Sequence, residues 1–261
     1  MEKFLVSAHT DVGTTKKVNQ DAIFVEEADT DIGPVLLAAV CDGMGGLSEG
    51  EKASAHLVTA LCEWFENSLA DAISREGCAP SLERFKEEMN FLIRRENTAI
   101  SAATKEASGT TITALLLSAG VYFTVNVGDS RIYHLSDALE QLTRDQTVVQ
   151  QDLDAGRITK EEAENHPQRS VLLQCVGASE GIVPDYSEGT YSIGDSFLLC
   201  SDGFRHVPSD AELESTLKES GKTEEELRQT LLQMTEHCKA GGEKDNISSV
   251  LIRVENGGRF F

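Results

Sequence analysis

The order of apolar and polar positions predicts a chain that alternates between groups of strands and groups of helices. Short apolar or β-branched runs, some nearly continuous in apolarity, are typical of strands buried between two layers. These runs cover residues 4–9, 22–26, 35–41, 110–117, 121–127, 131–135, 196–200 and 247–254.

Apolar residues at helical spacing predict two longer helices between the third and fourth strand runs. They are Leu57, Leu61, Phe65 and Leu69 in one helix, and Leu82, Phe85, Met89, Leu92 and Ile93 in the other. Because these helices follow one another instead of alternating with single strands, the pattern favours an antiparallel α+β sandwich over a doubly wound parallel sheet. Capping-box pairs predict helix starts at Ser48 with Glu51, Thr159 with Glu162, Ser209 with Glu212 and Thr223 with Glu226.

The 261 residues suit one large domain, since no repeat, low-complexity tract or linker divides them. The six cysteines show no metal-ligand spacing, which indicates a reducing compartment. The first ten residues lack the features of a secretion signal, and no apolar stretch is long enough to span a bilayer. We therefore expect a cytoplasmic protein.

The net charge of the chain limits the classes of molecule that it can bind. A formal net charge of -21 argues against nucleic acids and anionic membranes, because both attract clustered Lys and Arg. Much of this acidity fits a solvated surface. Some of it is also compatible with carboxylates that repel one another until a cation binds.

Aspartates beside apolar strand runs are the most informative feature. Residues 35–41 lead into the run Asp-Gly-Met-Gly-Gly at 42–46, 121–127 into Gly-Asp-Ser-Arg at 128–131, and 196–200 into Ser-Asp-Gly at 201–203. Asp245 directly precedes the last strand run. Any single Asp-Gly pair is explained best as turn chemistry. Four carboxylates in the same kind of place favour a shared site.

Converging carboxylates need a compensating charge, which divalent cations supply. Mg²⁺ and Mn²⁺ prefer oxygen ligands and keep several waters, which matches a site without His or Cys. Two such ions about 4 Å apart can share a water, lower its pKa and hold it in line with a phosphorus atom.

The ordered motifs of the chain resemble those of the metal-dependent protein phosphatase family (protein phosphatase 2C), most closely its compact bacterial branch. The resemblance covers nearly the whole chain. Its motifs are Thr10-Asp11-Val12-Gly13, Asn19-Gln20-Asp21, the run at 42–46, Gly109-Thr110-Thr111, Gly128-Asp129-Ser130-Arg131, His166-Pro167-Gln168-Arg169, Ser201-Asp202-Gly203 and Asp245-Asn246.

The resemblance implies a β-sandwich of two antiparallel sheets flanked by helices, with metals in a cleft at one end. It implies two Mn²⁺ or Mg²⁺ ions, with Asp42 bridging both, the Gly43 carbonyl binding one, and Asp202 and Asp245 completing the other. Asp21 would orient metal-bound water. Asp129 matches the family position that, with the aspartate of Ser-Asp-Gly, holds a weaker third ion.

Residues 147–176 resemble the flap beside the cleft of that branch, although a solvated helical hairpin without a catalytic role explains their composition equally well.

Three departures from the family pattern stand out. Lys16 replaces the Arg that clamps the substrate phosphate, and it would keep the charge without the planar grip. Gln20 replaces a Glu. Leu47 and Gln146 stand where His is frequent.

The function implied is direct hydrolysis of phosphoserine and phosphothreonine in proteins by a water held between two metals, with Lys16 stabilising the phosphate charge. A cytoplasmic Ser/Thr kinase and its targets would be the partners, and we expect a monomer. Cys41 and Cys200 lack the Cys-x5-Arg pattern of a nucleophile. One alternative is a non-catalytic module that binds phosphoproteins or regulatory partners. Another is a hydrolase of small phosphorylated metabolites.

Overall fold

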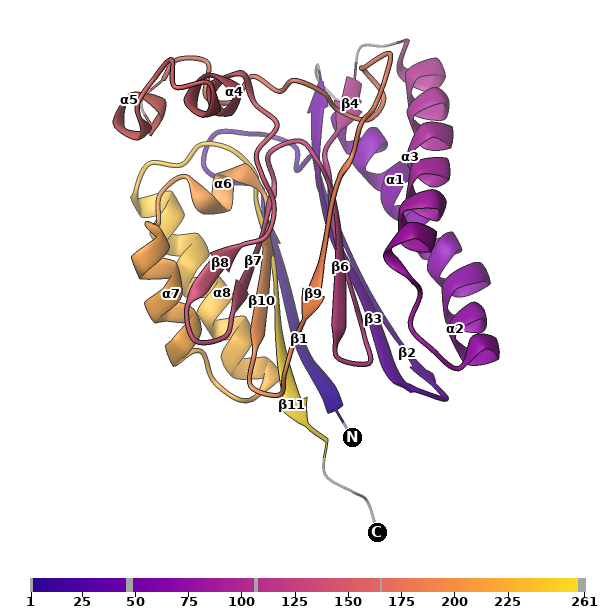
Figure 1. The fold of residues 1–261 in the computed structure, drawn as a ribbon. Coiled ribbons are helices and arrows are strands. Elements are labelled where there is room, and N and C mark those ends of the chain that lie inside the picture. Colours follow the sequence, from indigo (N-terminus) through magenta and orange to yellow (C-terminus); the bar gives the residue numbers. More distant parts are fainter. Residues whose placement is uncertain (1, 46–48, 106–107, 165, 258–261) are drawn as a thin grey trace.

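Two antiparallel sheets pack face to face in the computed structural model, which describes residues 2–45, 49–105, 108–164 and 166–257 (Figure 1). The first sheet has the order β1 (Glu2–Asp11), β11 (Ile247–Asn256), β10 (Ser196–Cys200), β7 (Arg131–Leu135) and β8 (Leu139–Gln141). The second has the order β2 (Asp21–Thr30), β3 (Gly33–Gly45), β5 (Ile112–Ser118), β6 (Val121–Val127) and β9 (Asp185–Thr190). A short strand, β4 (Ser108–Thr110), pairs with the end of β3.

Helices cover the outer face of each sheet, so the expected α+β sandwich is confirmed. α1 (Gly50–Trp64), the π-helical turn η1 (Phe65–Leu69), α2 (Ala70–Glu76) and α3 (Leu82–Thr104) lie on the second sheet, and α7 (Asp210–Glu219) and α8 (Glu224–Ala240) lie on the first (Figure 1). α6 (Asp202–Arg205) precedes α7. α4 (Val148–Asp154) and α5 (Lys160–Glu164) lie at the end of the sandwich, above α6 in Figure 1.

The continuous apolar runs have a simple cause, because each central strand is buried on both faces. In β3, Leu37 and Ala39 pack with the helices, whereas Leu36, Ala38 and Val40 pack in the core between the sheets. Alternation along a strand thus assigns each position to one of two apolar layers.

Several helix starts agree with the capping prediction. Ser209 and Glu212 form a reciprocal capping box at α7. The Thr223 hydroxyl accepts a hydrogen bond from the Glu226 amide at α8. The Thr159 hydroxyl likewise accepts from the Glu162 amide at α5. Ser48 lies outside the described residues.

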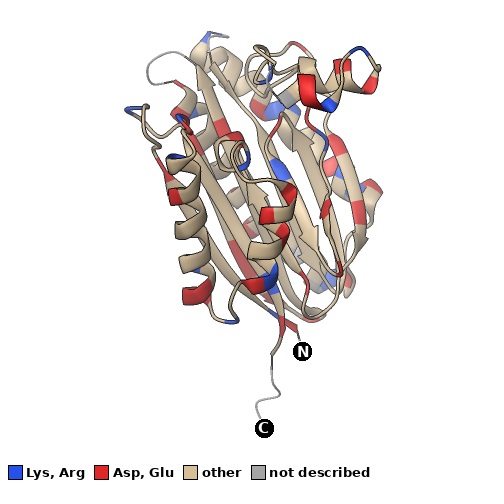
Figure 2. Cartoon of the chain, turned by 90° about the vertical axis from the view of Figure 1, so that its left-hand side faces the viewer, with Lys and Arg blue, Asp and Glu red and all other residues tan. Residues whose placement is uncertain are grey.

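The strands that the sequence pattern missed are short or at an edge: β4, β8 and β9. Figure 2 shows acidic positions spread over the helices and loops of one side, with basic positions among them. Within the ranges given above, no helix is both long enough and apolar enough to cross a membrane.

Candidate active site

The end of the core between the sheets holds two facing aspartates from neighbouring strands. Asp42 continues the alternation of Ala38 and Val40, which point toward the other sheet. The antiparallel register pairs Asp21, the first residue of β2, with Asp42. Two carboxylates that the chain separates by 21 positions therefore meet where the apolar layer ends.

The first sheet contributes two more of the predicted carboxylates, and Asp129 lies where the chain crosses from β6 of the second sheet to β7 of the first. Asp202 begins α6 directly after β10, and Asp245 lies just before β11, which pairs with β10. Asp129 follows β6 and is buried, as is Asp202. Mutual charge effects link Asp42 to Asp202, Asp129 and Asp245. The structure thus brings together the aspartates that the sequence singled out.

The cluster is electrostatically strained without added cations. Burial raises the pKa of Asp42 well above its usual range, and the charges of Asp21 and Asp202 add to the shift. Burial, with the charge of Asp202, also raises the pKa of Asp21 to about 7. Both Asp21 carboxylate oxygens are buried and accept no hydrogen bond of good geometry among the described residues, although the nearby hydroxyls of Ser248 and Ser201 lower its pKa in part. Such orphaned acceptors fit a site built to interact with bound cations or their waters.

The aspartates are spread out instead of closing on one point. In the described part of the chain, no three of them bring one oxygen each within 4.8 Å of all the others. Mg²⁺ and Mn²⁺ need few protein carboxylates each, because they keep several waters. The donor set of oxygens only therefore fits two hydrated divalent ions better than one fully caged ion.

Lys16 lies at the edge of this cluster. Its Nζ atom is 2.7 Å from Oδ1 of Asp245, and the side chain is 42% exposed. Burial lowers the pKa of Lys16, but the hydrogen bond and charge of Asp245 outweigh burial and raise it overall. Lys16 is therefore a charged, accessible group beside the carboxylates, as a phosphate-binding residue must be.

Asn246, next to Asp245, ties the loop that carries Lys16 to the start of β11. Its side-chain amide donates to the carbonyls of Val12 at 2.9 Å and Val18 at 3.2 Å, and its Oδ1 accepts from the Gln20 amide at 2.8 Å. The carbonyl of Gln20 in turn accepts from the Gly43 amide at 3.1 Å. The backbone of Gln20 thus links Asn246 to the residue after Asp42. Its neutral side chain removes one negative charge relative to the family's Glu.

Sequence reasoning missed the cations next to Ser-Asp-Gly, because it looked for carboxylates. Arg205 contacts Asp129 at 3.2 Å and Asp145 at 3.3 Å. His206 Nδ1 lies 3.0 Å from Glu243 Oε2, and its Nε2 lies 3.8 Å from Asp202 Oδ2. Their position, directly after the 201–203 motif and Phe204, is the signal that could have found them.

Gln146 and Leu47 stand where the family frequently has His, and the structure describes only Gln146. Gln146 is buried, and its Oε1 accepts from the Gly128 amide at 2.9 Å while its Nε2 donates to Asp185 at 2.9 Å. It therefore fastens the start of the 147–176 segment to the sandwich. Leu47 lies outside the described residues.

The 147–176 segment includes two short helices, α4 and α5, which lie beyond the same end of the sandwich as α6 (Figure 1). Hydrogen bonds anchor its base, from the Val148 amide to the Val171 carbonyl and from the Leu173 amide to the Gln146 carbonyl. Most of its side chains are exposed. The segment is a tethered helical pair, and its part in catalysis stays a prediction.

The cysteines beside the site are core residues. Cys41 and Cys200 are fully buried in separate apolar clusters. Burial raises the pKa of both thiols, that of Cys200 to about 12. Protonated, enclosed thiols are poor nucleophiles, which agrees with the sequence interpretation.

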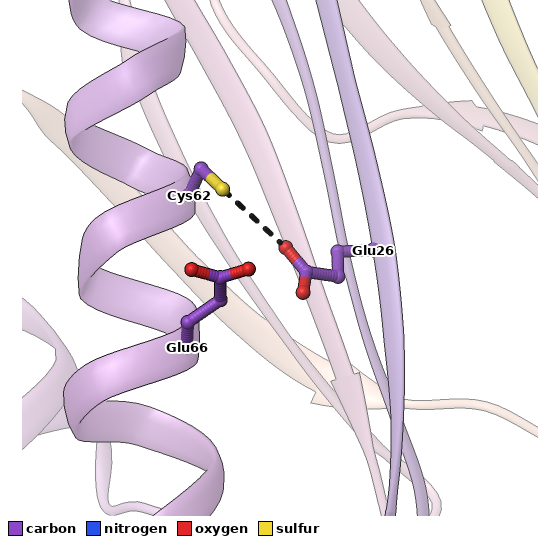
Figure 3. Close-up of side chains that lie close together, drawn as sticks. All are labelled: Glu26, Cys62 and Glu66. Carbon is purple, nitrogen blue, oxygen red and sulfur yellow. Dashed lines mark hydrogen bonds between the residues drawn. The ribbon is translucent and has the colours of Figure 1, made fainter.

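A second group of metal-ligating side chain types lies away from the cleft (Figure 3). Glu26 of β2, Cys62 of α1 and Glu66 of η1 converge, and the Cys62 thiol donates to Glu26 at 3.8 Å. Burial and the nearby carboxylates raise the pKa of this thiol. The thiol of Cys62 is therefore protonated and donates its hydrogen bond to Glu26, and the group needs no metal ion to explain it.

Comparisons with known proteins agree with this geometry. A family model described as Protein phosphatase 2C matches residues 10–251. The chain is 33% identical over 254 residues to the serine/threonine protein phosphatase PstP of Mycobacterium tuberculosis, covering 95% of this chain but only 44% of that protein. It is 34% identical over 244 residues to the serine/threonine phosphatase stp of Listeria innocua, covering 93% of each. The crystal structure of the PstP catalytic domain with 2 manganese ions superposes with a TM-score of 0.78 at 30% identity, covering 98% of this chain and 100% of that one.

Proposed function

Because the chain belongs to the protein phosphatase 2C family, we propose that it is a metal-dependent phosphatase that hydrolyses phosphoserine and phosphothreonine in proteins. One observation supports the proposal most directly: Asp42, Asp202 and Asp245, far apart in the chain, lie close enough in the fold for the charges of Asp202 and Asp245 to raise the pKa of Asp42. A non-catalytic module would have no need to keep all three.

Two divalent ions, Mn²⁺ or Mg²⁺, would be held by Asp42, the Gly43 carbonyl, Asp202 and Asp245. When bound, such ions lower the pKa of water and neutralise charge on a phosphate. The prediction that Asp129 and Asp202 hold a weaker third ion concerns a carboxylate that already contacts Arg205.

The protein side chains would position the reaction. Lys16, exposed at the cleft edge, would contact a non-bridging phosphate oxygen of the substrate and stabilise its charge. Asp21, buried behind Asp42, would accept a hydrogen bond from water at the site and so orient it. Direct hydrolysis needs no covalent phosphoenzyme, which is consistent with the buried, protonated thiols of Cys41 and Cys200.

The substrates would be phosphorylated proteins, with a Ser/Thr kinase and its targets as the natural partners. The chain would act as one phosphatase domain, as a monomer and in the cytoplasm. Support for protein substrates comes from the relatives, which are named as serine/threonine phosphatases. The mycobacterial relative is more than twice as long as the matched region, so these assignments concern the domain that this chain represents.

Activity measurements with a matched variant pair test the proposal. With Mn²⁺, the purified chain should hydrolyse p-nitrophenyl phosphate and a phosphothreonine peptide, and EDTA should abolish both activities. Asp202→Ala should be inactive, whereas Asp210→Ala, an exposed position on α7, should match the unmodified chain. Turnover that resists the chelator would overturn the mechanism. A preference for small phosphorylated metabolites over phosphopeptides would instead favour the metabolite hydrolase.

A further inference from the structure

Among the described residues, Asp129 is the only site aspartate that contacts an arginine; the others are Asp21, Asp42, Asp202 and Asp245. Arg205 Nη2 lies 3.2 Å from Asp129 Oδ2, and its Nε donates to the Asp129 carbonyl at 3.1 Å. The side chains are 10% and 5% exposed. A guanidinium stays protonated at every accessible pH, so this positive charge is permanent.

A second ion pair holds Arg205 in place. The same Nη2 atom lies 3.3 Å from Asp145 Oδ2. Asp145 accepts two hydrogen bonds of 2.8 Å from Arg131, one to each carboxylate oxygen. Two arginines and two aspartates thus form a network of balanced formal charge, in which Arg205 bridges Asp129 and Asp145.

The neighbouring carboxylates lack a buried arginine of this kind. Asp42 has no cation in contact among the described residues, Asp202 has only His206 at 3.8 Å, and Asp245 has the half-exposed Lys16. In the part of the chain that the structure describes, no buried guanidinium therefore competes with divalent ions for Asp42, Asp202 or Asp245. At Asp129 a divalent ion would share a carboxylate with a fixed guanidinium, and the two like charges would repel strongly at such a short distance.

We propose that Arg205 acts as a built-in cation in place of a third metal ion, so that this chain binds two divalent ions and not three. The inference rests on the proposed function, because the two ions are those of the proposed phosphatase site. Arg205 would be a positioning residue that fixes Asp129 and supplies its countercharge. The metal concentration needed for activity would then depend only on the affinities of these two sites.

The number of Mn²⁺ ions bound per chain at saturation, measured by calorimetric titration and by metal analysis after dialysis, tests the inference. The unmodified chain should bind two. Arg205→Gln should gain a third ion, and the double variant Arg205→Gln, Asp129→Asn should return to two. Arg205→Lys, which keeps the charge, should also bind two. A purely structural role for Arg205 would change stability without adding an ion.

Each outcome decides. If the unmodified chain binds three ions and Asp129→Asn binds two, the inference is wrong while the phosphatase proposal stands, and this comparison does not need the Arg205 variants to fold. A folded Arg205→Gln that still binds two ions would also overturn it. Three ions in Arg205→Lys would show that charge is not the cause. If the unmodified chain binds none, the proposed function itself fails.

Discussion

Asp21 lies directly opposite Asp42 in the antiparallel pairing of β2 and β3. Both carboxylates sit where the apolar core between the sheets ends, and neither Asp21 oxygen accepts a hydrogen bond of good geometry among the described residues. Ionising both groups in the metal-free protein is therefore unfavourable. Stability, metal binding and pH are coupled through this pair.

The metal-free protein should lose stability as pH rises between about pH 4 and pH 7. The pKa of Asp21 is about 7 when folded, against an ordinary value of 3.8. A raised folded pKa gives a stabilising contribution that is complete below 3.8 and is lost as pH rises through about 7. Burial raises the pKa of Asp129 to about 7 as well, which acts in the same direction. Thermal denaturation in EDTA should show a falling Tm, which saturating Mn²⁺ restores most at the higher pH. A Tm that rises over this range without metal would contradict the argument.

Replacing Asp21 should stabilise the metal-free chain and weaken the enzyme. Asp21→Asn removes a buried charge, so Tm in EDTA should exceed that of the unmodified chain most near pH 8, and the excess should shrink toward about pH 4, where Asp21 approaches full protonation in the unfolded chain as well. Activity with Mn²⁺ should fall about 10- to 100-fold, the usual cost of losing a group that orients a metal site. Asp29→Asn, an exposed change on the same strand, is the control and should alter neither property. Equal activity in Asp21→Asn would remove Asp21 from the proposed site.

Much of the fold and the carboxylate site could be predicted because both depend on local order along strands. The runs at 35–41, 121–127 and 196–200 are largely apolar, and Asp42, Asp129 and Asp202 follow them by one or two residues. β9 escaped detection because it is an edge strand, Asp185–Thr190, whose mixed polar sequence lacks the apolar face of the central strands. The contact between Arg205 and Asp129 joins residues 76 positions apart, and no periodicity signals such a pairing.

Lys16 should contribute to substrate turnover and should not strengthen metal binding. Lys16→Ala should lower kcat/KM for a phosphothreonine peptide roughly tenfold or more, the usual worth of a charge-assisted hydrogen bond to phosphate. Mn²⁺ should bind as tightly or more tightly, because a positive charge 2.7 Å from Asp245 is removed. Lys16→Arg should retain most of the activity, and Lys17→Ala, at the exposed neighbouring position, should behave as the unmodified chain. Weaker Mn²⁺ binding in Lys16→Ala would show that the lysine supports the metal site instead.

Gly43 should tolerate no side chain, because the backbone on both sides of the site packs against it. A Cβ atom at this position would lie 2.2 Å from the Gly50 carbonyl oxygen and 2.4 Å from that of Gln20. Gly43→Ala must therefore push apart β3, the start of α1 and the loop before β2, which should cost about 3 kcal/mol and displace Asp42. Gly181→Ala is the control, since a Cβ there meets nothing within 4 Å, and its cost should stay within about 0.5 kcal/mol. Urea denaturation gives the stabilities and calorimetry the Mn²⁺ affinity. A Gly43→Ala chain with unchanged stability and unchanged Mn²⁺ binding would show that the close approach of these three backbone segments does not hold Asp42 in place.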